Sequence, residues 1–256
     1  MLNAFLVVLL ACAIITFGIL SKRLNFQNGT VTLLLGVSIY IVLGRIVFFV
    51  SGVMLAFYYL ICYLLYLFSK SLYAKVFENV KKDAGLMLAL GGTLFAILLV
   101  LFLNKSTYAE MNYNFSFFKL VFFVSLASGF SLAFSNVING FAKGGISLST
   151  NSKTPPCEIG SITIIGALGA AISCFAIGFL VFTLENNVIW AIITVLLGFI
   201  GYLADALIKE KLQKRPPALN ENEETPTEFE SNYLSLTFVS VLLPTLIALI
   251  VGLIIK

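Results

Sequence analysis

Two charged side chains, Asp205 and Arg45, lie inside long apolar runs of the sequence. A charge buried in hydrocarbon costs about 3 kcal/mol or more, so each is a candidate functional residue. Gly198 and Gly201 precede Asp205 by seven and four residues. This spacing places the two glycines and the carboxylate on one helical face, as a smooth stripe of small residues that ends at Asp205. Such a carboxylate could hold a metal ion or orient a polar group. The alternative is structural, because Lys209 follows one helical turn later and could pair with Asp205.

A second polar face recurs at intervals of three and four residues in a neighbouring apolar run. It consists of Ser128, Ser131, Ser135 and Asn139, with Asn136 beside them. These hydroxyl and amide groups could bind a ligand. Such groups also hold helices together inside membranes, and the spacing alone leaves both interpretations open.

The composition excludes several kinds of chemistry. The chain has no histidine, and its four cysteines stand far apart without a Cys-x-x-Cys spacing. We therefore expect neither a zinc site nor a mechanism that uses a histidine base. The net charge of +4 is informative through its placement in loops, and nucleic-acid binding is not indicated.

Membrane-spanning helices must position these residues. The chain has 256 residues, of which 60% are hydrophobic and 11% charged, against about 25% charged in a soluble domain. At about 20 residues per span, this apolar content predicts an all-α polytopic transmembrane bundle of about eight spans, forming one integral-membrane domain over residues 1–256. The candidate spans are residues 2–20, 31–50, 52–69, 85–103, 115–135, 160–183, 187–208 and 234–255.

The basic residues predict the sidedness of this bundle. Of the 16 lysines and arginines, 12 share one side when eight spans alternate, while Arg45 lies within the second span. Because basic loops stay in the cytosol, we expect both termini on the non-cytosolic side. The basic residues on the expected cytosolic side are Lys22, Arg23, Lys70, Lys75, Lys81, Lys82, Lys143, Lys153, Lys209, Lys211, Lys214 and Arg215.

The loops differ in character. Residues 69–85 carry charges at helical spacings, which predicts a short interfacial helix. Residues 136–159 are rich in Asn, Gly, Ser, Thr and Pro and predict an irregular loop. Residues 209–233 begin basic, turn acidic and predict a disordered cytosolic loop. Only Ser51 and Gly52 separate the second and third spans, which predicts a tight helical hairpin with a polar break.

Three stretches at the expected cytosolic edges resemble one known family when they are taken in order. They are Ser135-Asn136, PPCEIGSITIIGALGAA from Pro155, and GYLADALIKEKLQ from Gly201 to Gln213. The family is the integral-membrane family that includes plant phytyl-phosphate kinase and animal transmembrane protein nineteen. Its pattern is Ser-Asp-Thr after a middle span, Pro-Pro-Gly-x-x-Gly-x-x-Ser-x-x-Gly at the next, and Gly-Ser-x-x-Asp-Ser-x-x-Gly-x-x-x-Gln at a later one. The matching positions are Pro155, Pro156, Gly160, Thr163 and Gly166 in the second stretch, and Gly201, Asp205 and Gln213 in the third.

The resemblance implies a phosphoryl transfer from a nucleoside triphosphate, CTP or ATP, to an isoprenoid alcohol or its monophosphate at the cytosolic face. The isoprenoid tail would lie in the lipid bilayer, between spans. Phosphoryl transfer depends on positioning and charge neutralisation, and Mg²⁺, the expected cofactor, prefers carboxylate oxygens. The candidate residues are Asp205 and Glu158 for the metal; Asp205, Asn136 and Lys153 for catalysis; and Ser135, Asn139, Lys143, Gly160 and Gln213 for substrate or nucleotide.

The sequence also departs from the family pattern. Asn136 stands where the family has Asp, and Cys157 where it has a loop glycine. An amide oxygen supplies no charge, so Asn136 should hold Mg²⁺ less well than Asp. The chain is therefore either a divergent phosphotransferase or a non-catalytic lipid-binding or transport-related protein that retains the fold. Lysine outnumbers arginine, which favours a bacterial cytoplasmic membrane and leaves an organelle membrane open.

Overall fold

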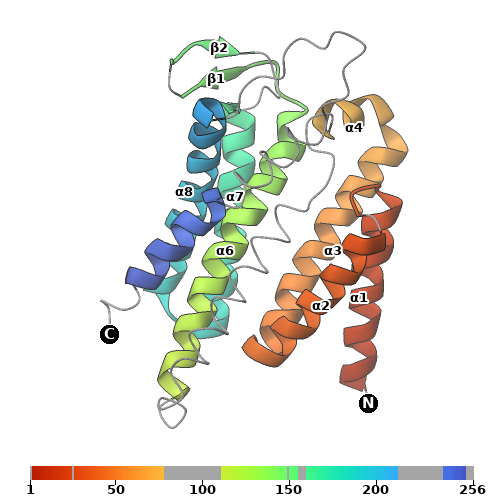
Figure 1. Ribbon diagram of the computed structural model, residues 1–256, viewed down its shortest axis with the longest axis vertical. Helices are drawn as coiled ribbons and strands as arrows, with labels where there is room; N and C mark the ends of the chain where they lie inside the picture. Colours follow the sequence, from red (N-terminus) through yellow and green to blue (C-terminus); the bar gives the residue numbers. More distant parts are fainter. Residues whose placement is uncertain are drawn as a thin grey trace.

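The computed structural model describes residues 2–24, 26–77, 111–148, 150–154, 160–212 and 239–251, and these are predominantly helical (Figure 1). The expectation of an all-α fold is confirmed. The helices are α1 (Leu2–Leu20), α2 (Phe26–Leu43), α3 (Arg45–Phe68), α4 (Lys70–Phe77), α6 (Met111–Asn139), α7 (Ile164–Glu185), α8 (Val188–Leu212) and a C-terminal helix, Val239–Val251.

The helices pack in two groups (Figure 1). In one, α1 and α2 lie against α3, and in the other α6, α7 and α8 lie against one another. α6 lies at the centre of the molecule, because 83% of its most apolar 18-residue stretch is buried. The corresponding fraction is 44% or less in the other three long apolar helices. The ring of Tyr58 on α3 lies 6.4 Å from that of Phe130 and 5.8 Å from that of Phe134 on α6, which joins the two groups.

Four helices in the described part of the chain are long and apolar enough to cross a bilayer: Arg45–Phe68, Phe118–Asn139, Ile164–Glu185 and Val188–Lys211. Three shorter apolar helical segments accompany them. They are Leu9–Leu20 within α1, Thr32–Leu43 within α2, and the C-terminal helix Val239–Val251. The span expected at residues 85–103 lies outside the described residues. A count of eight spans and the side on which each terminus lies therefore remain predictions.

The predicted hairpin break at Ser51–Gly52 is wrong. The helix break falls at Gly44, whose φ of 88° is in the region that favours glycine, and Arg45 is the first residue of α3 rather than part of the preceding span. Ser51 and Gly52 lie buried inside α3. Ser51 Oγ donates to the carbonyl of Val47 at 2.7 Å, so the helix itself satisfies the hydroxyl.

The prediction of an irregular loop over residues 136–159 is wrong in part. α6 continues to Asn139, and three short strands follow: β1 (Gly145–Ser147), β2 (Lys153–Thr154) and β3 (Ser161–Ile162). They form an antiparallel sheet in the order β2-β1-β3, with Gly145 opposite Thr154 and Ile146 opposite Ile162. Such short strands cannot be predicted in a stretch of turn-forming residues, because two or three residues are too few to show an alternating pattern.

The expected disorder from residue 209 onward is also wrong at its start. α8 continues through Leu212, and Lys209 is only 5% exposed. The favourable position of Lys209 and Lys211 at the negative end of the helix dipole supports this extension. Residues 213–233 lie outside the described part.

The short helix expected within residues 69–85 is confirmed for α4, and the residues after Phe77 are outside the described part. The hydroxyl of Tyr73 on α4 donates to the carbonyl of Ser21 in the turn after α1. The ammonium of Lys22 in that turn lies 5.0 Å from the centroid of the Tyr66 ring on α3. α4 is thus fastened to the connection between α1 and α2.

The two ends of the molecule carry different elements (Figure 1). We call one the sheet end: it carries β1–β3, the C-terminal ends of α6 and α8, and the N-terminal end of α7. The opposite end carries the turn between α2 and α3 and the turn between α7 and α8. The sheet end is the cytosolic face in the predicted sidedness.

Candidate functional site

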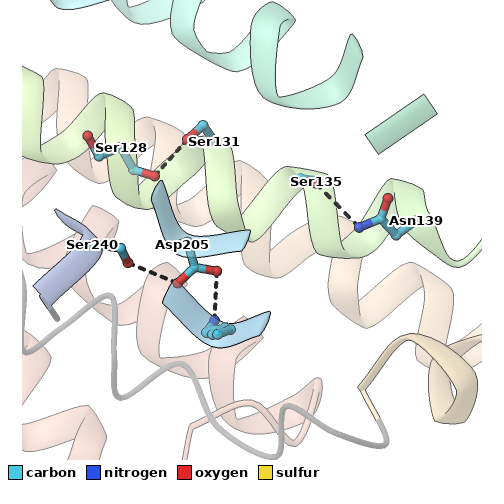
Figure 2. Close-up of polar contacts among 7 residues, drawn as sticks. Ser128, Ser131, Ser135, Asn139, Asp205 and Ser240 are labelled. Carbon is cyan, nitrogen blue, oxygen red and sulfur yellow. Dashed lines mark hydrogen bonds and ion pairs between the residues drawn. The ribbon is translucent and has the colours of Figure 1, made fainter. Parts of the chain in front are cut away.

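Asp205 lies on α8 near the sheet end, with its side chain 11% exposed. Lys209 Nζ is 2.8 Å from Asp205 Oδ2, and Ser240 Oγ donates to Oδ1 at 2.9 Å (Figure 2). Both partners are buried, at 5% exposure for Lys209 and 0% for Ser240. The structure therefore shows the ion pair that the sequence offered as the structural alternative for Asp205.

The small residues ahead of Asp205 explain how it is brought to this position. A Cβ added at Gly198 would lie 2.7 Å from Ala127 Cβ, and one at Gly201 would lie 2.6 Å from Ser128 Oγ. The two predicted glycines therefore let α8 pack directly on α6, within the group formed by α6, α7 and α8. The Lys209 side chain then lies one turn beyond Asp205 on the same buried face.

The polar face of α6 is buried in this interface. Ser131 Oγ donates to the carbonyl of Ser128 at 2.7 Å and lies 3.3 Å from the carbonyl of Gly198 on α8. The hydroxyl of Ser128 is buried without a hydrogen-bond partner among the described residues. For Ser131, contact between helices is the role that the geometry supports.

Ser135 and Asn139 join α6 to the start of α7. Asn139 Nδ2 donates to Ser135 Oγ at 3.4 Å (Figure 2), and Asn139 Oδ1 accepts from the hydroxyl of Thr163. Thr163 is the N-cap of α7, and its Oγ1 accepts from the backbone N–H of Gly166 at 2.8 Å. A Cβ at Gly166 would lie 1.9 Å from Asn139 Oδ1, so these helices meet without space for a larger residue.

The remaining candidates do not converge on Asp205. Asn136 is half-buried and makes no hydrogen bond with the described residues. Lys143 and Lys153 are exposed, before β1 and in β2 respectively. Gly160 is buried with φ of 80°, and a Cβ there would lie 2.7 Å from the backbone of Glu210 on α8. Glu158 and Gln213 lie outside the described residues.

Sequence reasoning missed two contacts that shape this end. Ser240 of the C-terminal helix, which donates to Asp205, was not among the candidates. Ser147 of β1 donates a hydrogen bond to the Glu210 carboxylate, which ties the sheet to α8. Sequence spacing does not reveal either contact, because each joins residues that are distant in the chain.

The described residues do not by themselves form a magnesium site. They contain no group of three or more His, Cys, Asp and Glu side chains placed to hold a metal ion. Both oxygens of Asp205 are engaged, so this carboxylate would accept a cation only after Lys209 left Oδ2. The arrangement instead offers a buried hydrogen-bond acceptor paired with an ammonium.

Comparison with known proteins places the chain in a family. No curated protein and no solved structure was found to match it. A family described as integral membrane protein DUF92 matches residues 9–235, nearly the full length. This confirms the resemblance drawn from the three sequence stretches. The chain belongs to the DUF92 family of integral membrane proteins.

Proposed function

We propose that this protein is a phosphotransferase that moves the terminal phosphoryl group of CTP or ATP onto an isoprenoid alcohol or its monophosphate at the cytosolic face. The observation that carries the proposal is the buried carboxylate of Asp205 at the sheet end of α8, within a stretch whose sequence resembles a motif of the family. A buried charge in a spanning helix is costly, which favours a functional reason for keeping it.

The contacts of Asp205 support a role as a proton acceptor. Its Oδ1 already accepts an O–H hydrogen bond from Ser240 at 2.9 Å, the same geometry that the hydroxyl of an acceptor lipid would use. In the proposed step the hydroxyl of the acceptor lipid gives its proton to the Asp205 carboxylate, while the lipid oxygen forms a bond to the terminal phosphorus of the nucleotide. The bond from that phosphorus to the bridging oxygen breaks, and the nucleoside diphosphate leaves.

Lysines at the sheet end supply the positive charge that phosphoryl transfer needs. Lys209 would shift from Asp205 Oδ2 toward the transferred phosphoryl group, while the exposed Lys143 and Lys153 contact the nucleotide phosphates. A Mg²⁺ ion bound to the nucleotide would supply the rest of the positive charge that the phosphates require.

The outer surface of α7 offers a path for the lipid tail. Leu168, Ile172, Phe175 and Phe179 are 58–67% exposed and recur at three- and four-residue intervals. Such a row forms a continuous apolar stripe that runs away from the sheet end. An isoprenoid tail on this stripe would leave its head group at the level of the polar residues.

A second candidate, a lipid-binding protein without catalysis, is favoured by two observations. The carboxylate of Asp205 is fully paired, and the uncharged Asn136 stands where the family resemblance implies an aspartate. In that case the ion pair stays within α8, the Ser240 hydrogen bond to Asp205 only joins α8 to the C-terminal helix, and the nucleotide has no role.

An assay on purified protein in lipid nanodiscs separates the two. The protein is incubated with Mg²⁺, γ-labelled CTP or ATP, and isoprenoid alcohols or monophosphates, and labelled lipid is measured. We expect transfer by the wild type and its loss in Asp205→Asn, which keeps an oxygen for Ser240. Thr194→Val is the matched control, since the Thr194 hydroxyl is buried in the same helix and donates to the Trp190 carbonyl one turn earlier. Full activity in Asp205→Asn would remove this residue from the mechanism.

A further inference from the structure

A cleft of about 270 Å³ opens at the end opposite the candidate site, between the two helix groups. One wall is the turn from α2 to α3, with Leu43, Arg45 and Ile46, and the other is formed by Lys119 of α6 and Glu185 of α7. The cleft therefore combines charged groups with apolar side chains at a position that the proposed function does not use.

The cleft has an excess of positive charge. Lys119 Nζ is 2.9 Å from Glu185 Oε1, so these two side chains largely neutralise each other. Arg45 is exposed and makes no ion pair within the described part of the chain. The first turn of α3 adds to this, because its N-cap Gly44 provides no side-chain acceptor for the free backbone N–H groups. An anion in the cleft would thus meet an available guanidinium beside a positive helix end.

Phosphate is the anionic group that these donors suit best, because a guanidinium binds it through two parallel hydrogen bonds. The cleft is smaller than the pockets of about 300–1,000 Å³ that enclose whole drug-sized ligands. It has space for a phosphate head group, and a longer molecule would have to continue outside it.

An apolar path leads away from the cleft along α3. Ile46 lines the cleft, and Val53 and Phe57 follow at offsets of seven and eleven residues on the same helical face. All three are 56–57% exposed. A chain bound there would leave a phosphate at Arg45 and extend over a surface that faces outward from the bundle.

We infer that this cleft binds the phosphate head group of an anionic phospholipid, with an acyl chain lying on the Ile46, Val53 and Phe57 stripe. Arg45 is the main contact, and the Lys119–Glu185 pair fixes the far wall. The inference does not depend on the proposed function, because the cleft lies at the other end of the molecule.

The single tryptophan provides a probe for this site. Trp190 lies in the first turn of α8 and packs, partly buried, against the cluster that contains Leu120, the neighbour of Lys119. The protein is placed in nanodiscs with rising fractions of brominated phosphatidylglycerol or brominated phosphatidylcholine, and quenching of Trp190 fluorescence gives the relative affinity of the two lipids.

We expect the wild type to favour the anionic lipid by about fivefold, the effect of one basic side chain near a charged head group. Arg45→Gln should reduce the preference to about one, and Arg45→Lys, which keeps the charge and loses the two parallel hydrogen bonds, should retain only part of it. Lys211→Gln, which removes an exposed lysine at the sheet end, is the control and should leave the preference unchanged.

Two results would overturn the inference. One is equal quenching by both lipids in the wild type. The other is an unchanged preference for the anionic lipid in Arg45→Gln.

Discussion

The buried ion pair of Asp205 and Lys209 predicts a strong energetic coupling between two substitutions on α8. Asp205→Asn preserves the shape of the side chain and its hydrogen bond from Ser240, but removes the negative charge that lies 2.8 Å from the ammonium. Lys209→Met leaves a carboxylate that is 11% exposed and held by Ser240 alone. Removing one partner of a buried pair typically costs about 3–5 kcal/mol, whereas removing both is often nearly neutral.

The two single substitutions should differ in cost. The long side chain of Lys209 can move its ammonium toward water at the end of α8, so Asp205→Asn should cost about 2 kcal/mol. The short side chain of Asp205 has no such freedom, so Lys209→Met should cost about 3 kcal/mol. If the double variant costs about 2 kcal/mol, the coupling free energy is about 3 kcal/mol.

Reversible unfolding in mixed detergent micelles measures these free energies for the wild type, both single variants and the double variant. Thr194→Val, which removes a hydroxyl bonded within the same helix, should cost about 1 kcal/mol or less. Single costs that add to within about 0.5 kcal/mol in the double variant would refute the buried pair.

Three further predictions concern packing and sidedness. Gly166→Ala should destabilise the protein by about 2 kcal/mol in the same unfolding assay, because the new Cβ would clash across the α6–α7 contact, whereas Gly29→Ala meets only ordinary contact and should be tolerated. Gly160→Ala, at positive φ and against α8, should increase protease cleavage between α6 and α7, and Gly144→Ala should not; equal cleavage would contradict the close approach. A fluorescent reporter fused after Lys256 should stay dark as a non-cytosolic fusion, and bright cytosolic fluorescence would reverse the predicted sidedness.

The parts of the fold that depend on local pattern could be predicted from the sequence. Long apolar runs predict helices, and the i to i+4 spacing of Asp205 and Lys209 predicts their pairing as one of two alternatives. The stripe of Gly198 and Gly201 predicts close helix contact, which the structure shows against α6. In each case the signal lies within one or two helical turns.

The features that the sequence did not reveal depend on conformation or on distant contacts. The break at Gly44 requires a positive φ, while Ser51 looked like a break but bonds within its own helix. The contact of Ser240 with Asp205 joins positions 35 residues apart. No periodicity encodes such a contact, so the full pairing of the carboxylate could not be predicted.

The central claim is that the Asp205–Lys209 pair serves phosphoryl transfer beyond holding helices together, and the double variant Asp205→Asn, Lys209→Met tests it most directly. This variant should stay folded, because neither charge is left alone. Transfer of γ-labelled phosphate to an isoprenoid alcohol or monophosphate is then measured beside the wild type. We predict labelled lipid with the wild type and none with the folded double variant. Labelled lipid formed equally by both, or by neither, would contradict the account.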